Sequence, residues 1–208
     1  LIEELDYLER SGFDRTLVKV SPRAHIVTDK HINKDKRSLA KKLGTTSKGI
    51  APCYADKMAR TGQLARDVLP SEMLWDESLD GRILCEGAQG YHLDIDQGNY
   101  PYVTSSTTLP YAACSLGFPP QKIRHIWGIS KIYDPRSGVD PLFPDDLLKD
   151  PDLTVLGDLG EEIGVTTGRR RHCNWLNLDL MIEAARQTGT THLVVNKCDI
   201  LKKLGIYK

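Results

Sequence analysis

The chain has 208 residues, of which 40% are hydrophobic, and this is enough for one domain with a substantial core. Its 28 Lys and Arg residues balance its 28 Asp and Glu residues, so no net charge attracts nucleic acid or a membrane surface. The five cysteines form no CxxC pair, and the sequence has no recognisable signal peptide and no run of about eighteen apolar residues. These features favour a soluble cytoplasmic protein with reduced thiols over a disulfide scaffold or a zinc site.

The first half of the chain predicts two helices and two short extended segments. Residues 1–13, LIEELDYLERSGF, have apolar residues at helical spacing, and Gly12 is the predicted stop of this helix. Extended segments are expected at residues 16–20 and 25–28. An amphipathic helix is then predicted within residues 54–68.

The second half predicts strands that alternate with helices. Compact apolar runs at residues 82–87, 123–133 and 191–197 are typical of buried strands, and the clearest helix of the chain, residues 175–189, lies between the last two. Residues 135–153 are rich in Pro and Asp and predict an ordered surface loop. This order predicts a single α/β domain with a mostly parallel central sheet flanked by helices.

The last strand run ends in the four residues NKCD, Asn196 to Asp199. A carboxylate at the last position can accept hydrogen bonds from N1–H and the 2-amino group of guanine, and adenine offers neither donor there. The alternative is that these polar residues only close a strand, since three fixed letters occur by chance in roughly a few per cent of such chains. Neither GxxxxGK[ST] nor GxGxxG occurs in the sequence.

A second polar cluster, GVTTGRRRHCNW, covers residues 164–175. Thr166 and Thr167 can donate hydroxyl hydrogens, Gly168 permits close approach to the backbone, and residues 169–171 are arginines with planar donor groups. We interpret this cluster as a clamp for a carboxylate or phosphate. The alternatives are a solvated basic turn and a weak nucleic-acid signal, and the balanced charge disfavours the latter.

Two further polar segments could contribute to a site. Residues 44–60, GTTSKGIAPCYADKMAR, could cradle an anion at a helix amino terminus, or their Thr and Ser could be ordinary helix caps. In the following segment, Gln89 would present a neutral amide at the end of a strand. Asp94 and Asp96 could form a paired carboxylate or metal site, or the polar face of a strand. The six histidines lack HxxxH and HxH spacing, which favours packing or surface roles.

Five segments, in this order along residues 21–199, resemble the adenylosuccinate synthetase family: SPRAHIV, GTTSKGIAPCYADKMAR, EGAQGYHLDIDQGNYPYVTSS, GVTTGRRRHCNW and NKCD. The resemblance implies a P-loop-NTPase-like synthetase fold and a carbon–nitrogen ligase of purine (AMP) biosynthesis. Such an enzyme joins L-aspartate to IMP with GTP and gives adenylosuccinate through a 6-phosphoryl-IMP intermediate.

The resemblance also implies roles for individual residues. Gln89 would assist catalysis by hydrogen-bonding the 6-oxo edge of the purine as charge builds there. IMP binding would involve Thr46, Arg60, Gln89, Thr104 and Arg169, with Arg60 reaching the site of the neighbouring subunit in a homodimer. Aspartate binding would involve Val165, Thr166, Thr167, Gly168, Arg169, Arg170 and Arg171, and GTP binding would involve Arg171, Lys197, Cys198 and Asp199.

Parts of the family pattern are absent from these 208 residues. The catalytic Asp and His and the loop that holds phosphate and Mg²⁺ are expected outside them, so we expect a central fragment, incomplete at both ends, that is inactive alone and carries no metal site. The short spacing between GTTSKG and EGAQG resembles archaeal and phage-borne forms, one of which uses dGMP in place of IMP. RSGVDP, residues 136–141, departs from the family's RVGxGP and would place Ser137 and Asp140 near the purine.

The acceptor is therefore left open between IMP and dGMP. A non-catalytic guanine-nucleotide-binding module and an RNA-binding domain that uses RRRH are the alternatives from other classes of protein.

Overall fold

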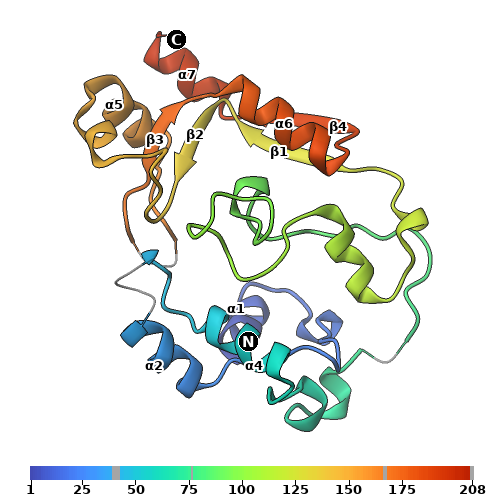
Figure 1. Cartoon of the computed structure of the whole chain (residues 1–208). Coiled ribbons are helices and arrows are strands. Elements are labelled where there is room, and N and C mark those ends of the chain that lie inside the picture. Colours follow the sequence, from blue (N-terminus) through green and yellow to red (C-terminus); the bar gives the residue numbers. More distant parts are fainter. Residues whose placement is uncertain (39–42, 76, 166–167, 207–208) are drawn as a thin grey trace. The chain divides into compact units, whose positions relative to one another are not determined.

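The computed structural model describes residues 1–38, 43–75, 77–165 and 168–206 (Figure 1). The chain divides into two compact units. Unit 1 consists of Leu1–Asp35 and Lys48–Ile83, and unit 2 consists of Lys36–Ser47 and Leu84–Lys208. The prediction of a single domain stays a prediction.

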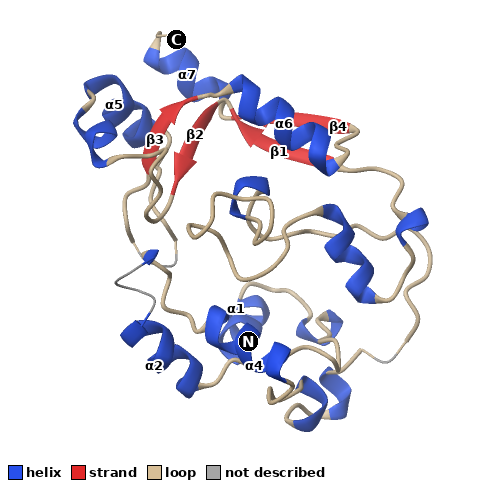
Figure 2. Cartoon of the chain, viewed as in Figure 1, coloured by secondary structure: helices blue, strands red, loops and turns tan. Residues whose placement is uncertain are grey.

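Unit 1 is formed by helices and loops (Figure 2). Its helices are α1 (Ile2–Arg10), the start of α2 (Asp29–Ser38) and α4 (Ile50–Ala59), with single 3₁₀ turns η1 (Arg15–Leu17), η2 (Ala65–Asp67) and η3 (Ser71–Met73). Helix α1 begins with acidic and ends with basic residues, which favours it electrostatically, and it confirms the first predicted helix. Of the two expected extended segments, the first begins inside η1, and within the described residues they form only isolated bridges, between Val20 and Leu74 and between His25 and Leu64.

The predicted helix at residues 54–68 begins earlier and ends much earlier than expected. Arg60 adopts a left-handed conformation with φ of 63° and closes α4. The amides of Thr61 and Gly62 then fold back onto the carbonyl of Asp56, and this prevents a further helical turn. The helical pattern of the following residues is realised only as η2.

Two buried polar residues connect α2 with α4. His31 Nδ1 accepts the backbone N–H of Thr28 at 2.9 Å, so its Nε2 carries the proton and donates to Asp56 Oδ2 at 3.0 Å. Asp35 Oδ2 accepts the amide of Gly49 at 2.9 Å. A Cβ at Gly49 would come within 2.7 Å of the backbone nitrogen of Ile32, so only glycine permits this approach.

The strands found in the described residues all belong to unit 2. They are β1 (Trp127–Lys131), β2 (Tyr133–Arg136), β3 (His172–Trp175) and β4 (His192–Asn196). Its helices are α5 (Pro151–Leu159), α6 (Leu178–Thr188) and α7 (Cys198–Leu204), and its 3₁₀ helices are η4 (Tyr91–Leu93), η5 (Pro110–Leu116), η6 (Pro120–Lys122) and η7 (Asp145–Lys149).

The strands form two pairs. β1 and β4 are parallel, in register from Trp127 opposite His192 to Lys131 opposite Asn196. β2 and β3 are antiparallel, from Tyr133 opposite Trp175 to Arg136 opposite His172. The parallel pair and its helices confirm the predicted α/β class. Helix α6 and strand β4 lie where the sequence places them, and Gly189 ends α6 in a left-handed conformation.

Two sequence predictions in this region are wrong. Residues 82–87 are not a strand, because within the described residues their backbone pairs with no neighbouring strand, and Leu84 is 90% exposed. The expected loop at residues 135–153 includes the end of β2, the helix η7 and the start of α5. Asp150 caps α5 by accepting the amides of Asp152 and Leu153, and Pro151 fits the first helical position.

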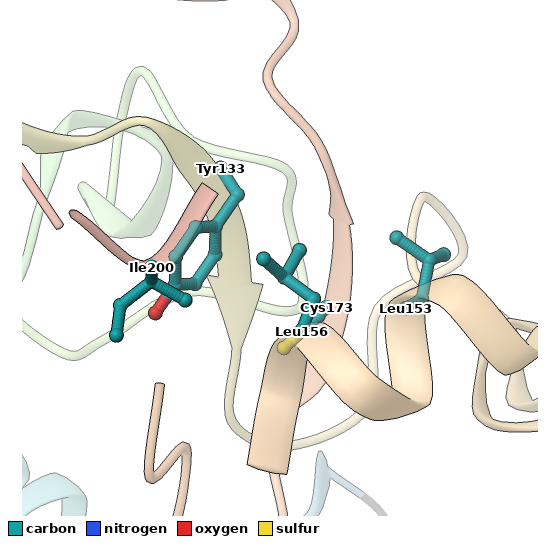
Figure 3. Close-up of a cluster of buried hydrophobic side chains, with 5 residues drawn as sticks. All are labelled: Tyr133, Leu153, Leu156, Cys173 and Ile200. Atoms are coloured by element: carbon teal, nitrogen blue, oxygen red, sulfur yellow. The ribbon is translucent and has the colours of Figure 1, made fainter. Parts of the chain in front are cut away.

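The core of unit 2 lies where α5 and α7 meet the antiparallel pair (Figure 3). Its buried side chains are Tyr133, Leu153, Leu156, Cys173 and Ile200. Partly buried apolar residues surround this cluster, among them Trp175 and Leu204. The core therefore joins β2 and β3 to α5 and α7, and the candidate site is built from the segments next to these elements.

Candidate functional site

The arginine segment forms a tight loop between α5 and β3. Arg170 bridges Ile163 in antiparallel fashion, and the amide of Gly164 donates to the carbonyl of Arg169 at 2.8 Å. Gly168, with φ of 64°, donates back to the carbonyl of Gly164 at 2.7 Å. Val165 at the tip is 98% exposed, whereas Thr166 and Thr167 lie outside the described residues. Val165 is therefore accessible to a ligand.

The three arginines of this loop do not point at one target. Arg169 Nη2 donates to the carbonyl of Gly44 at 2.9 Å, so the structure brings the start of GTTSKG, which includes Thr46, to the loop. Arg170 instead pairs with Asp158 of α5 at 2.6 Å and donates to a carbonyl of the same helix. The contacts of Arg170 are those of a residue that attaches the loop to α5.

The third arginine, Arg171, ends at a buried carboxylate. Glu162 is 1% exposed, and its Oε2 accepts Arg171 Nη1 at 2.8 Å. Its Oε1 accepts the hydroxyl of Tyr133 at 2.6 Å and a further hydrogen bond from Lys131 Nζ. We call these four residues the Glu162 cluster. Arg171 Nε also donates to Ser137 Oγ at 3.2 Å, which places Ser137 beside the arginine.

The Glu162 cluster keeps its carboxylate ionised. Burial alone would raise the pKa of Glu162, but the hydrogen bonds from Lys131, Tyr133 and Arg171 outweigh it and hold the pKa below its usual value. Burial, together with the hydrogen bond to Glu162, raises the pKa of Tyr133, which therefore stays a neutral donor. Sequence reasoning missed Glu162, because nothing in the letters GEEIG separates it from its exposed neighbour Glu161.

The NKCD corner lies at the carboxyl end of β4, as predicted. Lys197, with φ of 61°, precedes α7, and its Nζ donates to the carbonyl of Gly160 at 3.2 Å. Cys198 is exposed in the first turn of α7. The exposed carboxylate of Asp199 lies 3.6 Å from Lys203 Nζ, one turn further along the helix. Lys197 therefore braces the corner, and Asp199 faces solvent where a ligand can reach it.

The loop that follows Gln89 is organised by Asp94, which is fully buried. Oδ1 of Asp94 accepts the amides of Asp96 and Gln97 at 2.9 and 3.0 Å, and Oδ2 accepts the hydroxyl of Thr107 at 2.8 Å and the amide of Thr108 at 2.6 Å. Burial would raise the pKa of Asp94, but these hydrogen bonds together lower it.

These contacts agree with neither interpretation of Asp94 and Asp96, since residues 94–96 are not part of a strand. Asp96 is exposed, and both oxygens of Asp94 serve its own loop. In the part of the chain that the structure describes, no three or more His, Cys, Asp or Glu residues are grouped so that they could hold a metal ion. Asp94 is therefore a structural residue of the loop. The predicted IMP residue Thr104 lies on the same loop, where its amide donates to the carbonyl of Leu93 at 2.8 Å.

Asp140 connects this loop with the turn after β2. Its Oδ1 accepts Asn99 Nδ2 at 2.9 Å and the amide of Leu142 at 3.0 Å. Its Oδ2 lies 3.2 Å from Arg136 Nε, and Arg136 Nη2 donates to the carbonyl of Tyr102 at 2.5 Å. The carboxylate of Asp140 is thus used within the chain, and its expected position near the purine stays a prediction.

The remaining predicted residues are exposed. Gln89 has φ of 64°, a conformation that residues other than glycine seldom adopt and that is common at ligand sites. Arg60 closes α4 in unit 1, whereas the other predicted residues belong to unit 2. Within unit 2 the structure brings the loop of Arg169 and Arg171 to Gly44 and, through the turn at Gly160, to Lys197.

These features define an α/β protein with a loop of arginines before β3 and an exposed carboxylate after β4. A family model described as adenylosuccinate synthetase matches residues 1–81 and 71–206, and the chain belongs to this family. The two matched stretches meet at residues 71–81, between GTTSKG and EGAQG.

Curated relatives named adenylosuccinate synthetase align with all or nearly all of the chain. That of Desulforapulum autotrophicum is 36% identical over 98% of this chain and 61% of the relative, and that of Shouchella clausii is 34% identical over 100% and 61%. The first alignment is 267 positions long, which exceeds the 208 residues of the chain, so the relative carries extra residues within it. The chain spans about three fifths of the length of these relatives.

Solved structures show the same fold. A fully ligated adenylosuccinate synthetase from Plasmodium falciparum is 25% identical and superposes with a TM-score of 0.83 over 96% of this chain and 60% of its own. A succinoaminodeoxyadenylate synthetase of cyanophage S-2L, bound to dGMP and dATP, is 18% identical with a TM-score of 0.69 over 96% and 66%. The latter likeness concerns the fold alone.

Proposed function

We propose that the chain is the central part of a synthetase that ligates L-aspartate to IMP with GTP and gives adenylosuccinate. The observation that carries this proposal is the family match along residues 1–81 and 71–206. The arrangement of unit 2 supports it, because an exposed carboxylate at the NKCD corner and an arginine loop occur on one unit at the ends of β4 and β3. The rest of the relatives' length would supply the residues that this chain lacks.

In the proposed reaction N1 of the purine loses its proton, the oxygen at C6 attacks the γ-phosphorus of GTP, and GDP leaves. The amine of aspartate then attacks C6, the C6–O bond breaks, phosphate leaves, and the amine loses a proton. The exposed amide of Gln89 would hydrogen-bond the 6-oxo edge and stabilise the charge that develops there. Arg169 and the exposed Val165 would hold the carboxylates of aspartate, and the resemblance to the family adds Thr166 and Thr167 to this role.

Guanine would be read at the NKCD corner. The carboxylate of Asp199 is exposed and can accept both N1–H and the 2-amino group of guanine, and the Lys197 side chain is held in place by the carbonyl of Gly160. Arg171 would lie near GTP with its guanidinium fixed by Glu162. ATP lacks both donors, so we expect the enzyme to prefer GTP.

Mg²⁺ is implied by the family, but the residues that the structure describes do not fit it. They contain no group of three or more His, Cys, Asp or Glu that could hold a metal ion. We therefore place its ligands, with the catalytic Asp and His, outside these residues and derive no step through it. The 208 residues alone are then expected to be inactive.

We further propose a cytoplasmic homodimer in which Arg60 contacts the nucleotide of the neighbouring subunit. Arg60 is exposed at the end of α4, which supports a role between subunits. All five cysteines lie in the described part of the chain and carry free thiols, which agrees with a reducing compartment. Of the helices described, none is long and apolar enough to cross a membrane.

dGMP is the second candidate acceptor, because RSGVDP departs from the apolar family pattern at Ser137 and Asp140. Asp140 Oδ1 already accepts hydrogen bonds from Asn99 and Leu142. This favours IMP as the acceptor over dGMP, if dGMP would need this carboxylate for its recognition. The complete gene product, given GTP and aspartate with either IMP or dGMP, tests the choice by phosphate release. We expect release with IMP. No release with either acceptor contradicts the proposal, and tight GTP binding without release points to a non-catalytic module.

A further inference from the structure

The Glu162 cluster lies at a junction between the arginine loop and the NKCD corner of unit 2. Glu162 holds Lys131 at the end of β1 and Arg171 just before β3. Two residues earlier, the carbonyl of Gly160 accepts Lys197 from the NKCD corner. One short turn, Gly160–Glu162, thus connects the arginine loop with the base-reading corner.

Arg171 makes more hydrogen bonds than an ion pair with Glu162 alone would need. Its Nη1 is held by Glu162 and its Nε by Ser137, so two donors in different directions fix the plane of the guanidinium. The arginine side chain is 30% exposed, whereas the Glu162 side chain is 1% exposed and cannot reach a ligand itself. A guanidinium oriented in advance loses less conformational freedom when it binds an anion.

The cluster also has an unbalanced charge. One carboxylate holds two cations, Lys131 and Arg171, and both are partly exposed. The carboxylate therefore neutralises only one of them, and an anionic ligand at the strand ends would meet the surplus positive charge. Binding of such a ligand would neutralise the second cation of the cluster.

We propose that Glu162 is a positioning residue, which acts through Arg171 to set the affinity for the guanine nucleotide. This inference rests on the proposed function for the identity of the ligand, but not for the contact between Glu162 and Arg171. The competing explanation is that the cluster only stabilises the fold, as many buried ion pairs do.

A double-mutant cycle separates the two explanations. The dissociation constant of a fluorescent, non-hydrolysable GTP analogue is measured for the complete protein and for Glu162→Gln, Arg171→Gln and the double variant. Gln matches the volume of Glu but cannot accept from Arg171 and Lys131 together. We expect Glu162→Gln to weaken binding about tenfold, and the double variant to bind no more weakly than Arg171→Gln alone. Independent effects that multiply in the double variant overturn the proposal.

Two further variants show whether a loss of affinity in Glu162→Gln comes from misfolding of the protein. Glu161→Gln removes the same charge from the exposed neighbouring residue and should bind like the unmodified protein. Glu162→Asp keeps the charge but shortens the reach to Arg171, and should weaken binding by about threefold. Affinity that is unchanged in both Glu162 variants contradicts the proposal.

The contact itself is tested without nucleotide. Phenylglyoxal modifies accessible arginines, and peptide mass spectrometry gives the rate at Arg171. We expect this rate to rise several-fold in Glu162→Gln and to stay unchanged in Glu161→Gln. An unchanged rate in Glu162→Gln overturns the positioning role. If the unmodified protein binds no guanine nucleotide while the rate still rises, the proposed function fails and the positioning of Arg171 stands.

Discussion

Replacing Asp94 by Asn tests whether this buried carboxylate holds the loop of residues 90–108 in place. The substitution keeps the size of the side chain but places an amide nitrogen where an oxygen accepted two hydrogen bonds. If Oδ1 stays with Asp96 and Gln97, the new NH₂ group faces the N–H of Thr108 and the hydroxyl of Thr107. The hydroxyl can turn and accept, but the amide of Thr108 is left without a partner.

The magnitude follows from these contacts. A hydrogen bond to a charged group contributes about 1.5–3 kcal/mol, and an unsatisfied buried donor costs about 1–3 kcal/mol. We expect the loop to lose about 3 kcal/mol of local stability, which corresponds to a roughly hundredfold faster amide hydrogen exchange if exchange occurs by local opening. KM for the purine nucleotide should rise as well, since Thr104 and Gln89 are attached to this loop.

Hydrogen exchange followed by mass spectrometry on peptides from residues 90–108 measures the effect. Asp96→Asn is the matched control, because Asp96 is exposed and its side chain serves no such role in the loop. Its peptides should exchange like those of the unmodified protein. If Asp94→Asn also leaves the exchange unchanged, the assignment of Asp94 as the residue that organises the loop is wrong.

Three further predictions concern the core of unit 2. Leu156→Ala should lower the free energy of unfolding by about 2–5 kcal/mol in urea titrations, because Leu156 is fully buried. A smaller loss would show that Leu156 is not a main contributor to the core. The lowered pKa of Glu162 stabilises the folded state above the unfolded value near 4.5, and this contribution is lost as the pH falls through the folded pKa. Urea unfolding between about pH 5 and pH 3 should therefore show a smaller loss of stability for Glu162→Gln than for the unmodified protein, and equal losses would contradict the reasoning. Burial raises the pKa of Cys173 to about 11, so a thiol reagent should label the exposed Cys85 and Cys198 first and Cys173 only on unfolding; early labelling of Cys173 would show that the core is not closed.

The sequence alone predicts those parts of the fold whose signals are local. Helix α6 has helical periodicity and a glycine stop, and β4 is a compact apolar run that ends in polar residues. Both lie within a few residues of their predicted bounds. The apolar run of β4 itself predicts that NKCD lies at the end of a strand, so this prediction does not depend on residues that are distant in the sequence.

Other features depend on partners that are distant in the sequence. Residues 82–87 have the composition of a buried strand, but in the described part of the chain no strand lies beside them to accept their hydrogen bonds. Asp94 and Glu162 look like ordinary acidic residues until folding surrounds them with Thr108, Tyr133 and Arg171. Burial of a charge is a tertiary property, and for this reason the sequence left the role of Asp94 open between a metal site and the polar face of a strand, and overlooked Glu162.

The transfer of oxygen from the purine to phosphate tests the proposed ligase reaction most directly. The complete protein is given GTP, aspartate and IMP labelled with ¹⁸O at C6, and the released phosphate is analysed by mass spectrometry. Our account predicts that each phosphate carries one ¹⁸O atom, because the 6-oxygen is phosphorylated and then leaves with the phosphate. Phosphate released without the label, with the ¹⁸O atom found in water instead, would contradict it.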